Sequence, residues 1–65
     1  MPSSVIRSYR YDPTGRHLDV VFVSGRLYRY HDVPEDIYQG MRRAFSRGEY
    51  FNANIRERFR YTREH

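Results

Sequence analysis

The stretch LDVVFVSGRLYRYHDVP, residues 18–34, determines the fold that we predict for this 65-residue chain. Apolar and polar residues alternate on both sides of its Ser24-Gly25 pair, and Pro34 closes it. Alternation on either side of a glycine-containing turn is typical of a β-hairpin. We therefore predict strands over residues 17–23 and 26–31.

The length of the hairpin loop decides which face each side chain occupies. A three-residue loop, Val23–Gly25, with glycine in the left-handed conformation sets Val20 opposite Tyr28 and Leu18 opposite Tyr30. A two-residue loop would turn both tyrosines to the other face. We prefer the first register because it makes one apolar face, and it predicts that both tyrosines belong to the core instead of a base-stacking site.

The segment before the hairpin predicts one more strand, over residues 5–11, which are rich in β-branched and aromatic residues. Ile6 and Tyr9 lie three positions apart, so both face the core only if a β-bulge separates them. The following Asp12–Gly15 is a turn signal. Together with the hairpin, this strand predicts a three-stranded antiparallel β-meander.

A first helix is predicted over about residues 34–46. Pro34 suits a first helical turn, and Asp32 with Glu35 has the spacing of a capping box. Gly40 costs about 1 kcal/mol relative to alanine, which is tolerable if a strand crosses close beneath it. The apolar stripe of this helix consists of Ile37, Tyr38, Met41, Ala44 and Phe45.

A second helix is predicted over about residues 49–58, and a polar tail over residues 60–65. Gly48 is expected to end the first helix, while Ser46 and Glu49 have capping-box spacing for the second. The predicted fold class is α+β: one domain, with the meander followed by two short helices packed on one face of the sheet.

The composition limits the classes of function. The chain has no cysteine, which excludes disulfides and cysteine-ligated metals, and its three histidines lack metal-ligand spacing. No window approaches the roughly 20 apolar residues of a membrane span, so a cytoplasmic protein is expected. The sequence places no carboxylate pair against a nucleophile. We therefore predict a non-enzymatic module with no catalytic residue, metal or cofactor.

All twelve basic residues are arginines, and the net charge is +4. A GC-rich genome would produce the same bias without any function. Guanidinium groups bind phosphate bidentately and stack on rings, which makes RNA or other nucleic acid an expected partner. The candidate binding residues are Arg29, Arg42, Arg43, Arg47, Arg56 and Arg60.

The preferred register directs Arg29 away from the two tyrosines, onto the reverse face of the sheet. That face also receives Val21 and Leu27, together with Arg7 and His31. Because it is half apolar and basic, it is the better candidate for a stacking platform if the helices cover only the other side. The same apolar pair, rimmed by arginines, supports a rival interpretation: a protein-interaction module, accessory or phage-encoded, that docks on a larger protein.

Several short motifs together resemble the KTSC domain family: Ser3-Ser4-x-Ile6, Tyr11-Asp12, Leu18-x-Val20-x-Phe22, Gly25, Tyr28-x-Tyr30, Val33-Pro34 and Ser46-x-Gly48-x-Tyr50-Phe51-Asn52-x-x-Ile55-Arg56. The family is named for its place at the C-terminus of some lysyl-tRNA synthetases and also occurs as small standalone bacterial and phage proteins. The resemblance implies no established activity; the synthetase fusion suggests RNA binding. The motif residues expected to be structural are Tyr28, Tyr30, Pro34, Ser46, Gly48, Phe51 and Asn52, the last as a buried polar tie between helix and sheet.

Overall fold

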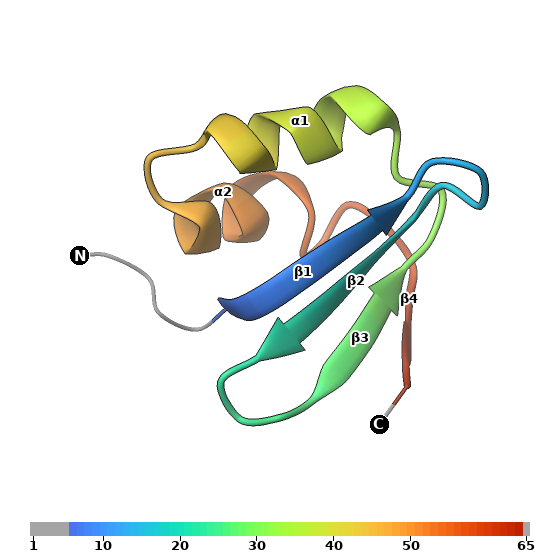
Figure 1. Cartoon of the computed structure of the whole chain (residues 1–65), viewed down its shortest axis with the longest axis vertical. Helices are drawn as coiled ribbons and strands as arrows, with labels where there is room; N and C mark the ends of the chain where they lie inside the picture. Colours follow the sequence, from blue (N-terminus) through green and yellow to red (C-terminus); the bar gives the residue numbers. More distant parts are fainter. Residues whose placement is uncertain (1–5, 65) are drawn as a thin grey trace.

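The computed structural model describes residues 6–64 and contains one four-stranded antiparallel sheet and two helices (Figure 1). The start of the first predicted strand at residue 5, the Ser3-Ser4 motif and residue 65 lie outside the described residues. The strands follow one another across the sheet in the order β1-β2-β3-β4. The elements are β1 (Ile6–Asp12), β2 (His17–Phe22), β3 (Leu27–Tyr30), α1 (Glu35–Arg43), α2 (Arg47–Asn54) and β4 (Tyr61–Arg63).

The hairpin of β2 and β3 has the register predicted from a three-residue loop. Val20 pairs with Tyr28, and Leu18 pairs with Tyr30. Gly25 has a φ of +94°, and its N–H donates to the carbonyl of the last residue of β2 at 2.8 Å. The predicted bulge is also present, since the pairing of β1 with β2 shifts after Ile6.

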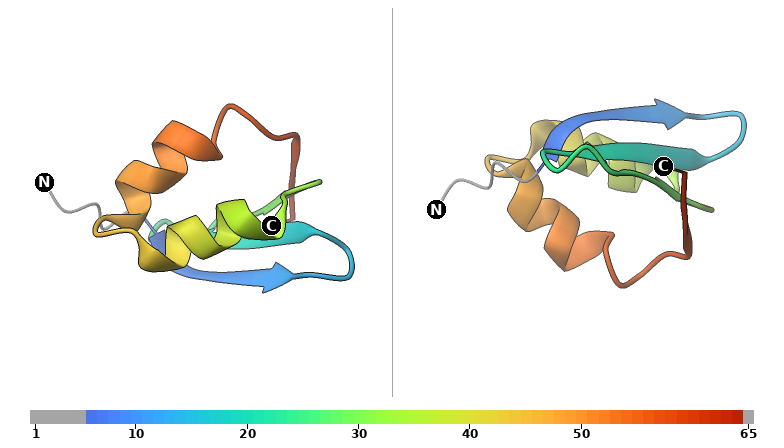
Figure 2. Two further views of the ribbon diagram at one scale, coloured as in Figure 1. Left: turned by 90° about the horizontal axis from the view of Figure 1, so that it is seen from above. Right: turned by 90° about the horizontal axis from the view of Figure 1, so that it is seen from below.

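Both helices lie on one face of the sheet (Figure 2). The ring of Tyr38 in α1 stacks on Tyr11 of β1 with centroids 4.6 Å apart, and Phe51 in α2 meets Tyr30 of β3 at 5.3 Å. Between these contacts lies the core, whose buried residues are Leu18, Val20, Tyr30, Val33, Met41, Phe51 and Ile55. We call the other side of the sheet the open face; by register it carries Ser8, Arg10, Asp12, His17, Asp19, Val21, Leu27, Arg29 and Thr62.

The first helix is shorter than predicted. Its N-cap is Pro34, without a side-chain cap, because Asp32 adopts a left-handed conformation with a φ of +58° and lies outside the helix. This turn lets the next residue, Val33, enter the core with its N–H bonded to a carbonyl of the β1–β2 turn. The predicted capping box is therefore wrong. At the other end the chain becomes extended, so Phe45 leaves the apolar stripe and is fully exposed.

The second helix begins earlier and ends sooner than predicted. Ser46 is its N-cap, as expected, and its Oγ accepts from the N–H of Glu49 at 3.3 Å. Gly48 does not end α1; it is buried inside the first turn of α2. The helix stops at Asn54 because the next residue, Ile55, turns fully into the core with non-helical φ and ψ.

The polar tail contains a strand that the sequence pattern did not predict. β4 pairs with β3, setting Tyr61 opposite Tyr30 and Arg63 opposite Tyr28. The ring of Tyr61 stacks on Tyr28, with centroids 5.1 Å apart and planes nearly parallel. Backbone bonds of 2.8 Å continue the pairing on both sides of β4. Within the described residues, no helix is long and apolar enough to cross a lipid bilayer.

Gly40 of α1 faces the ring of Tyr50 from α2. A Cβ at this position would lie 2.7 Å from Cζ of Tyr50 and closer still to its hydroxyl, which donates to the carbonyl of Ile37 at 2.9 Å. We expected a strand to pass close to Gly40. The close neighbour is instead a side chain of α2.

We expect Gly40→Ala to lower the free energy of unfolding by about 1–3 kcal/mol, because an added methyl overpacks the contact. In a helix without this contact the same change would stabilise by about 1 kcal/mol. Urea denaturation followed by circular dichroism measures the difference. The loss of unfolding free energy caused by Gly40→Ala should be smaller in a Tyr50→Phe background, which lacks the hydroxyl oxygen nearest to the added methyl. If Gly40→Ala stabilises the otherwise unmodified protein, the contact with Tyr50 is contradicted.

Candidate functional site

A groove of about 350 Å³ lies between the β2–β3 hairpin and α2. Sites for small ligands are typically about 300–1,000 Å³. We call this the aromatic groove; it is lined by Phe22, Val23, Ser24, Arg26, Tyr28, Tyr30, Phe51, Asn52 and Arg56. Its walls come from two elements whose sequences are more than twenty residues apart, so the groove exists only because α2 packs on the hairpin.

The aromatic rings of the groove are packed edge to face. Phe22 meets Tyr28 at 5.4 Å and Phe51 at 5.6 Å, both in T-shaped geometry. Tyr30 is only 2% exposed, whereas Tyr28 is partly exposed. The prediction that the two tyrosines belong to the core is therefore confirmed for Tyr30. Tyr28 both packs against the core and presents a ring to the groove.

Burial raises the pKa of Tyr30 to about 12. The nearby hydroxyls of Tyr61 and Tyr28 act in the same direction, and the charge of Arg56 opposes them. Loss of the Tyr30 proton is thus disfavoured, because the ionised ring would be poorly solvated. The groove keeps a neutral phenol among its lining residues at ordinary pH.

The rim of the groove is polar and basic. Arg56 and Asn52 are both exposed, and Nη1 of Arg56 donates to Oδ1 of Asn52 at 3.5 Å. Asn52 is therefore not the buried polar tie that we expected. Among the described residues, the lining includes two arginines and no carboxylate. This arrangement favours an anionic or electron-rich ligand.

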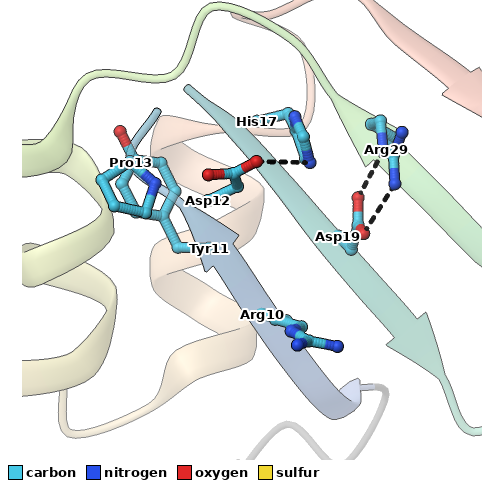
Figure 3. Close-up of a pocket in the computed structure, with 7 residues that line it drawn as sticks. All are labelled: Arg10, Tyr11, Asp12, Pro13, His17, Asp19 and Arg29. Atoms are coloured by element: carbon cyan, nitrogen blue, oxygen red, sulfur yellow. Dashed lines mark hydrogen bonds and ion pairs between the residues drawn. The ribbon is translucent and has the colours of Figure 1, made fainter. Parts of the chain in front are cut away.

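A second hollow, of about 310 Å³, lies on the open face (Figure 3). Apart from Arg10, its charged groups are already paired: Nε and Nη2 of Arg29 donate to the two carboxylate oxygens of Asp19 at 2.8 and 3.1 Å. These bonds hold the pKa of Asp19 below its ordinary value. Nε2 of His17 lies 3.6 Å from Oδ2 of Asp12. A phosphate approaching Arg29 would have to compete with Asp19, which makes this hollow a poor anion site.

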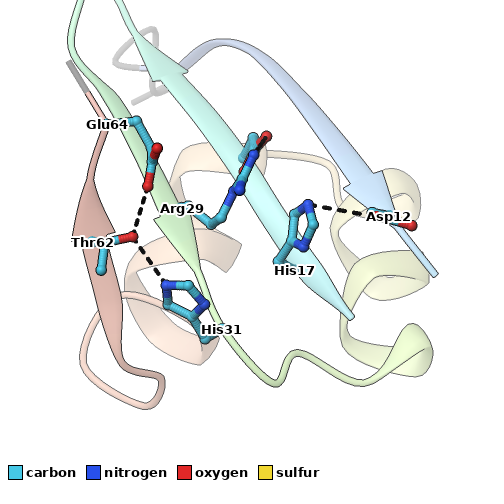
Figure 4. Close-up of polar contacts among 7 residues, drawn as sticks. Asp12, His17, Arg29, His31, Thr62 and Glu64 are labelled. Atoms are coloured by element: carbon cyan, nitrogen blue, oxygen red, sulfur yellow. Dashed lines mark hydrogen bonds and ion pairs between the residues drawn. The ribbon is translucent and has the colours of Figure 1, made fainter. Parts of the chain in front are cut away.

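The open face also lacks what a stacking platform needs. The sheet tyrosines and Phe22 pack on the helix side with their rings against α1, α2 or each other. Stacking on the described part of the open face would fall to the imidazoles of His17 and His31, which already contact Asp12 and Thr62. Its other contacts are polar, with His31 Nε2 3.0 Å from Oγ1 of Thr62, which in turn donates to Glu64 at 2.8 Å (Figure 4). These contacts join β4 to the end of β3.

The helical arginines do not gather with Arg29 on one surface. Arg47 reaches back to β1, where its Nε donates to the hydroxyl of Tyr9 at 3.1 Å and its guanidinium lies 5.6 Å from that ring centroid. Arg42 and Arg43 are exposed at the end of α1, the former bonded to Gln39. They lie outside both hollows.

Arg60 and Arg56 follow α2. Arg60 lies 4.0 Å from Asp32, with both side chains largely exposed. Arg56 is the one sequence candidate that lines the aromatic groove. Its partner there is Arg26 of the hairpin loop, which sequence reasoning missed because no local pattern indicates that this loop faces α2.

Comparison with known proteins gives consistent matches over the chain. The family model of the KTSC domain matches residues 2–59. A crystal structure of a KTSC domain protein from Yersinia pestis superposes with a TM-score of 0.87, covering 97% of this chain and 92% of that one at 34% identity. An uncharacterised protein of Stutzerimonas stutzeri is 42% identical over 97% of this chain and 90% of its own length.

Part of a larger enzyme matches as well. A lysine–tRNA ligase of a Nostoc species is 40% identical over 58 residues, and one of Trichormus variabilis is 38% identical over the same length. The match covers 89% of this chain but only 10% of each enzyme. The chain thus spans about a tenth of the length of these ligases.

Proposed function

The chain belongs to the KTSC domain family, and from this premise we propose that it is a small non-enzymatic module that binds single-stranded RNA in the aromatic groove. One observation carries the proposal: the groove combines aromatic walls with two arginines and, among the described residues, no carboxylate. The similarity to a segment of lysine–tRNA ligases favours RNA over DNA as the nucleic acid.

The two kinds of side chain would supply different parts of the affinity. Stacking of a base on an aromatic ring contributes about 1–3 kcal/mol in single-strand binding. Phe22 and Tyr28 are the partly exposed rings of the groove, and Tyr61 covers one face of Tyr28. Arg26 and Arg56 would bind the adjacent phosphates. Each phosphate contact releases counterions, so the affinity should fall steeply with salt.

We expect saturable binding of a labelled mixed-sequence RNA oligonucleotide at low salt, with a Kd below about 100 μM, measured by fluorescence anisotropy. Arg56→Gln should weaken binding about ten-fold or more, since a hydrogen bond to a charged group contributes about 1.5–3 kcal/mol. The same variant should lower the slope of log K against log salt by about 0.7.

The matched control is Arg10→Gln, which removes the same charge from an exposed position on the open face. It should leave the salt slope nearly unchanged. Absence of saturable binding would refute the proposal, and equal effects of the two variants would show that the groove is not where the RNA binds.

A protein-interaction role has one specific observation in its favour. Phe45 is fully exposed between the two helices, and Val23 of the hairpin loop is 61% exposed. Exposed aromatic residues are enriched at protein interfaces. Recovery of one nuclease-resistant protein partner in a pulldown, and its loss with Phe45→Ser, would favour this role over RNA binding.

A further inference from the structure

A row of aromatic rings leads from the aromatic groove to the edge of the sheet. Phe22 of β2 meets Tyr28 of β3 edge to face at 5.4 Å, and Tyr28 stacks on Tyr61 of β4 at 5.1 Å with an interplanar angle of 1°. The rings follow the strand order β2-β3-β4, so Phe22 and Tyr61 approach Tyr28 from opposite sides. The row therefore begins in the groove and ends at Tyr61.

The ring of Tyr61 packs on its neighbours from the side of β3. The two rings that it contacts, Tyr28 and Tyr30, both belong to that strand. β4 is the outermost strand of the sheet, with no further strand beyond it in the described part of the chain (Figure 1). Tyr61 is 50% exposed although one face of its ring is stacked. An aromatic surface that continues an existing stack is therefore accessible beside the groove.

An arginine lies next to this ring on the same side of the sheet. Arg63 pairs opposite Tyr28 and is two residues from Tyr61, so all three side chains lie on the helix side, and Arg63 and Tyr61 are about 7 Å apart along the strand. Arg63 is exposed. The carboxylate of Glu64 accepts from Thr62 at 2.8 Å, and Thr62 lies on the open face. The positive charge of Arg63 therefore faces the groove side, whereas the adjacent carboxylate is held on the other side.

These two side chains combine what single-strand binding requires, a ring for a base and a cation for the backbone. Resting on the proposed RNA binding in the aromatic groove, we infer that β4 forms a second nucleotide subsite beside it. The accessible face of Tyr61 stacks one base of the bound strand, and Arg63 binds the neighbouring phosphate. The subsite accepts any base, because every base has a π-face.

Tyr61→Leu tests the stacking, because leucine keeps an apolar side chain beside Tyr28 but removes the flat ring. Fluorescence anisotropy with the labelled mixed-sequence RNA should give a Kd at least about five-fold higher, the lower end of what one stacked base contributes. Tyr61→Phe keeps the ring and should bind like the unmodified protein. The matched control is Phe45→Leu, which removes an exposed ring outside the groove lining and should leave the Kd unchanged.

Tyr61→Trp reports contact with the RNA directly, because the chain contains no tryptophan of its own. A base stacked on the indole ring quenches its fluorescence, so titration with unlabelled RNA should lower the emission along the same binding curve that anisotropy gives. Phe45→Trp places the same fluorophore at another exposed position and should not respond. This measurement separates contact with RNA from a role of Tyr61 in holding β4 on the sheet.

Arg63→Gln tests the phosphate contact. It should lower the slope of log K against log salt by about 0.7, the value for one phosphate of a single strand. The control is again Arg10→Gln on the open face, which should leave the slope nearly unchanged. Equal slopes for Arg63→Gln and the unmodified protein would overturn the assignment of a phosphate to Arg63.

The outcomes distinguish the subsite from the proposed function. Absence of saturable RNA binding to the unmodified protein overturns the proposed function and the subsite with it. If Arg56→Gln weakens binding, an unchanged Kd of Tyr61→Leu or an unquenched emission of Tyr61→Trp overturns the subsite while RNA binding in the groove stands. Weaker binding by Tyr61→Leu together with quenching in Tyr61→Trp, but not in Phe45→Trp, supports the subsite.

Discussion

Phe51→Ala is expected to lower the free energy of unfolding by about 3–5 kcal/mol, the range for removing a buried aromatic ring. Phe51 is 2% exposed, and its ring meets those of Phe22 and Tyr30 at 5.6 and 5.3 Å. At about 0.05–0.15 kcal/mol per residue, a domain of 65 residues has a total stability of roughly 3–10 kcal/mol. The substitution therefore removes a large part of that total.

The chain contains its own matched control. Phe45 is fully exposed, so Phe45→Ala should change the stability by less than about 0.5 kcal/mol. Urea denaturation followed by circular dichroism compares the two variants. If Phe51→Ala does not fold, Phe51→Leu keeps most of the volume and should show a loss of about 1 kcal/mol. Similar losses from Phe51→Leu and Phe45→Ala would contradict the packing described above.

The second large effect is a loss of stability at alkaline pH. Burial raises the pKa of Tyr30 to about 12 in the folded protein, against about 10 for an unperturbed tyrosine. As the pH rises above 10, the unfolded chain loses this proton first, so unfolding becomes more favourable. The stabilisation that comes from the raised pKa of Tyr30 is intact below pH 10 and is lost between pH 10 and 12. At about 1.4 kcal/mol per pH unit it amounts to about 3 kcal/mol.

Denaturation curves at a series of pH values measure this loss, with tyrosinate absorbance as an independent check on ionisation. Tyr30→Phe should reduce the dependence of the free energy of unfolding on pH above 10. A residual slope is expected from Tyr11, whose pKa is also raised by burial. Tyr61→Phe, which alters a ring that is 50% exposed, should reduce the pH dependence only in part, because burial is the main cause of the raised pKa of Tyr30. An undiminished slope in Tyr30→Phe would show that another group is responsible.

The three-stranded meander could be predicted from the sequence because its signals are local. Alternation around Gly25 determines the register of β2 and β3, and the spacing of Ile6 and Tyr9 requires the bulge in β1. The ends of the helices were harder to predict. Phe45 and Ile55 both fit a helical period, yet the chain leaves the helix at each position, so that Phe45 is exposed and Ile55 is buried. Tertiary packing, not local sequence, determines this difference.

The fourth strand and the groove depend on contacts between distant segments. β4 has three residues, too few for an alternating pattern, and Tyr61 was its only apolar signal. In the candidate site, Tyr28 and Arg56 could be singled out from the sequence. Arg26 and Ser24 could not, because their role arises only when α2 packs beside the hairpin loop. The ion pair of Arg29 with Asp19 is different, because the predicted register already places the two residues opposite each other.

The short strand β4 also divides the domain into parts of unequal local stability. All three of its residues are exposed, and none belongs to the buried core, so its detachment removes no buried side chain, although Tyr61 would leave the ring of Tyr30. Such sub-global opening requires less free energy than complete unfolding. The species that remains is the three-stranded meander with two helices, and in it the ring of Tyr28 has lost its cover. Any ligand that prefers the uncovered ring would shift the population toward this open form, which makes ligand binding and strand detachment linked equilibria.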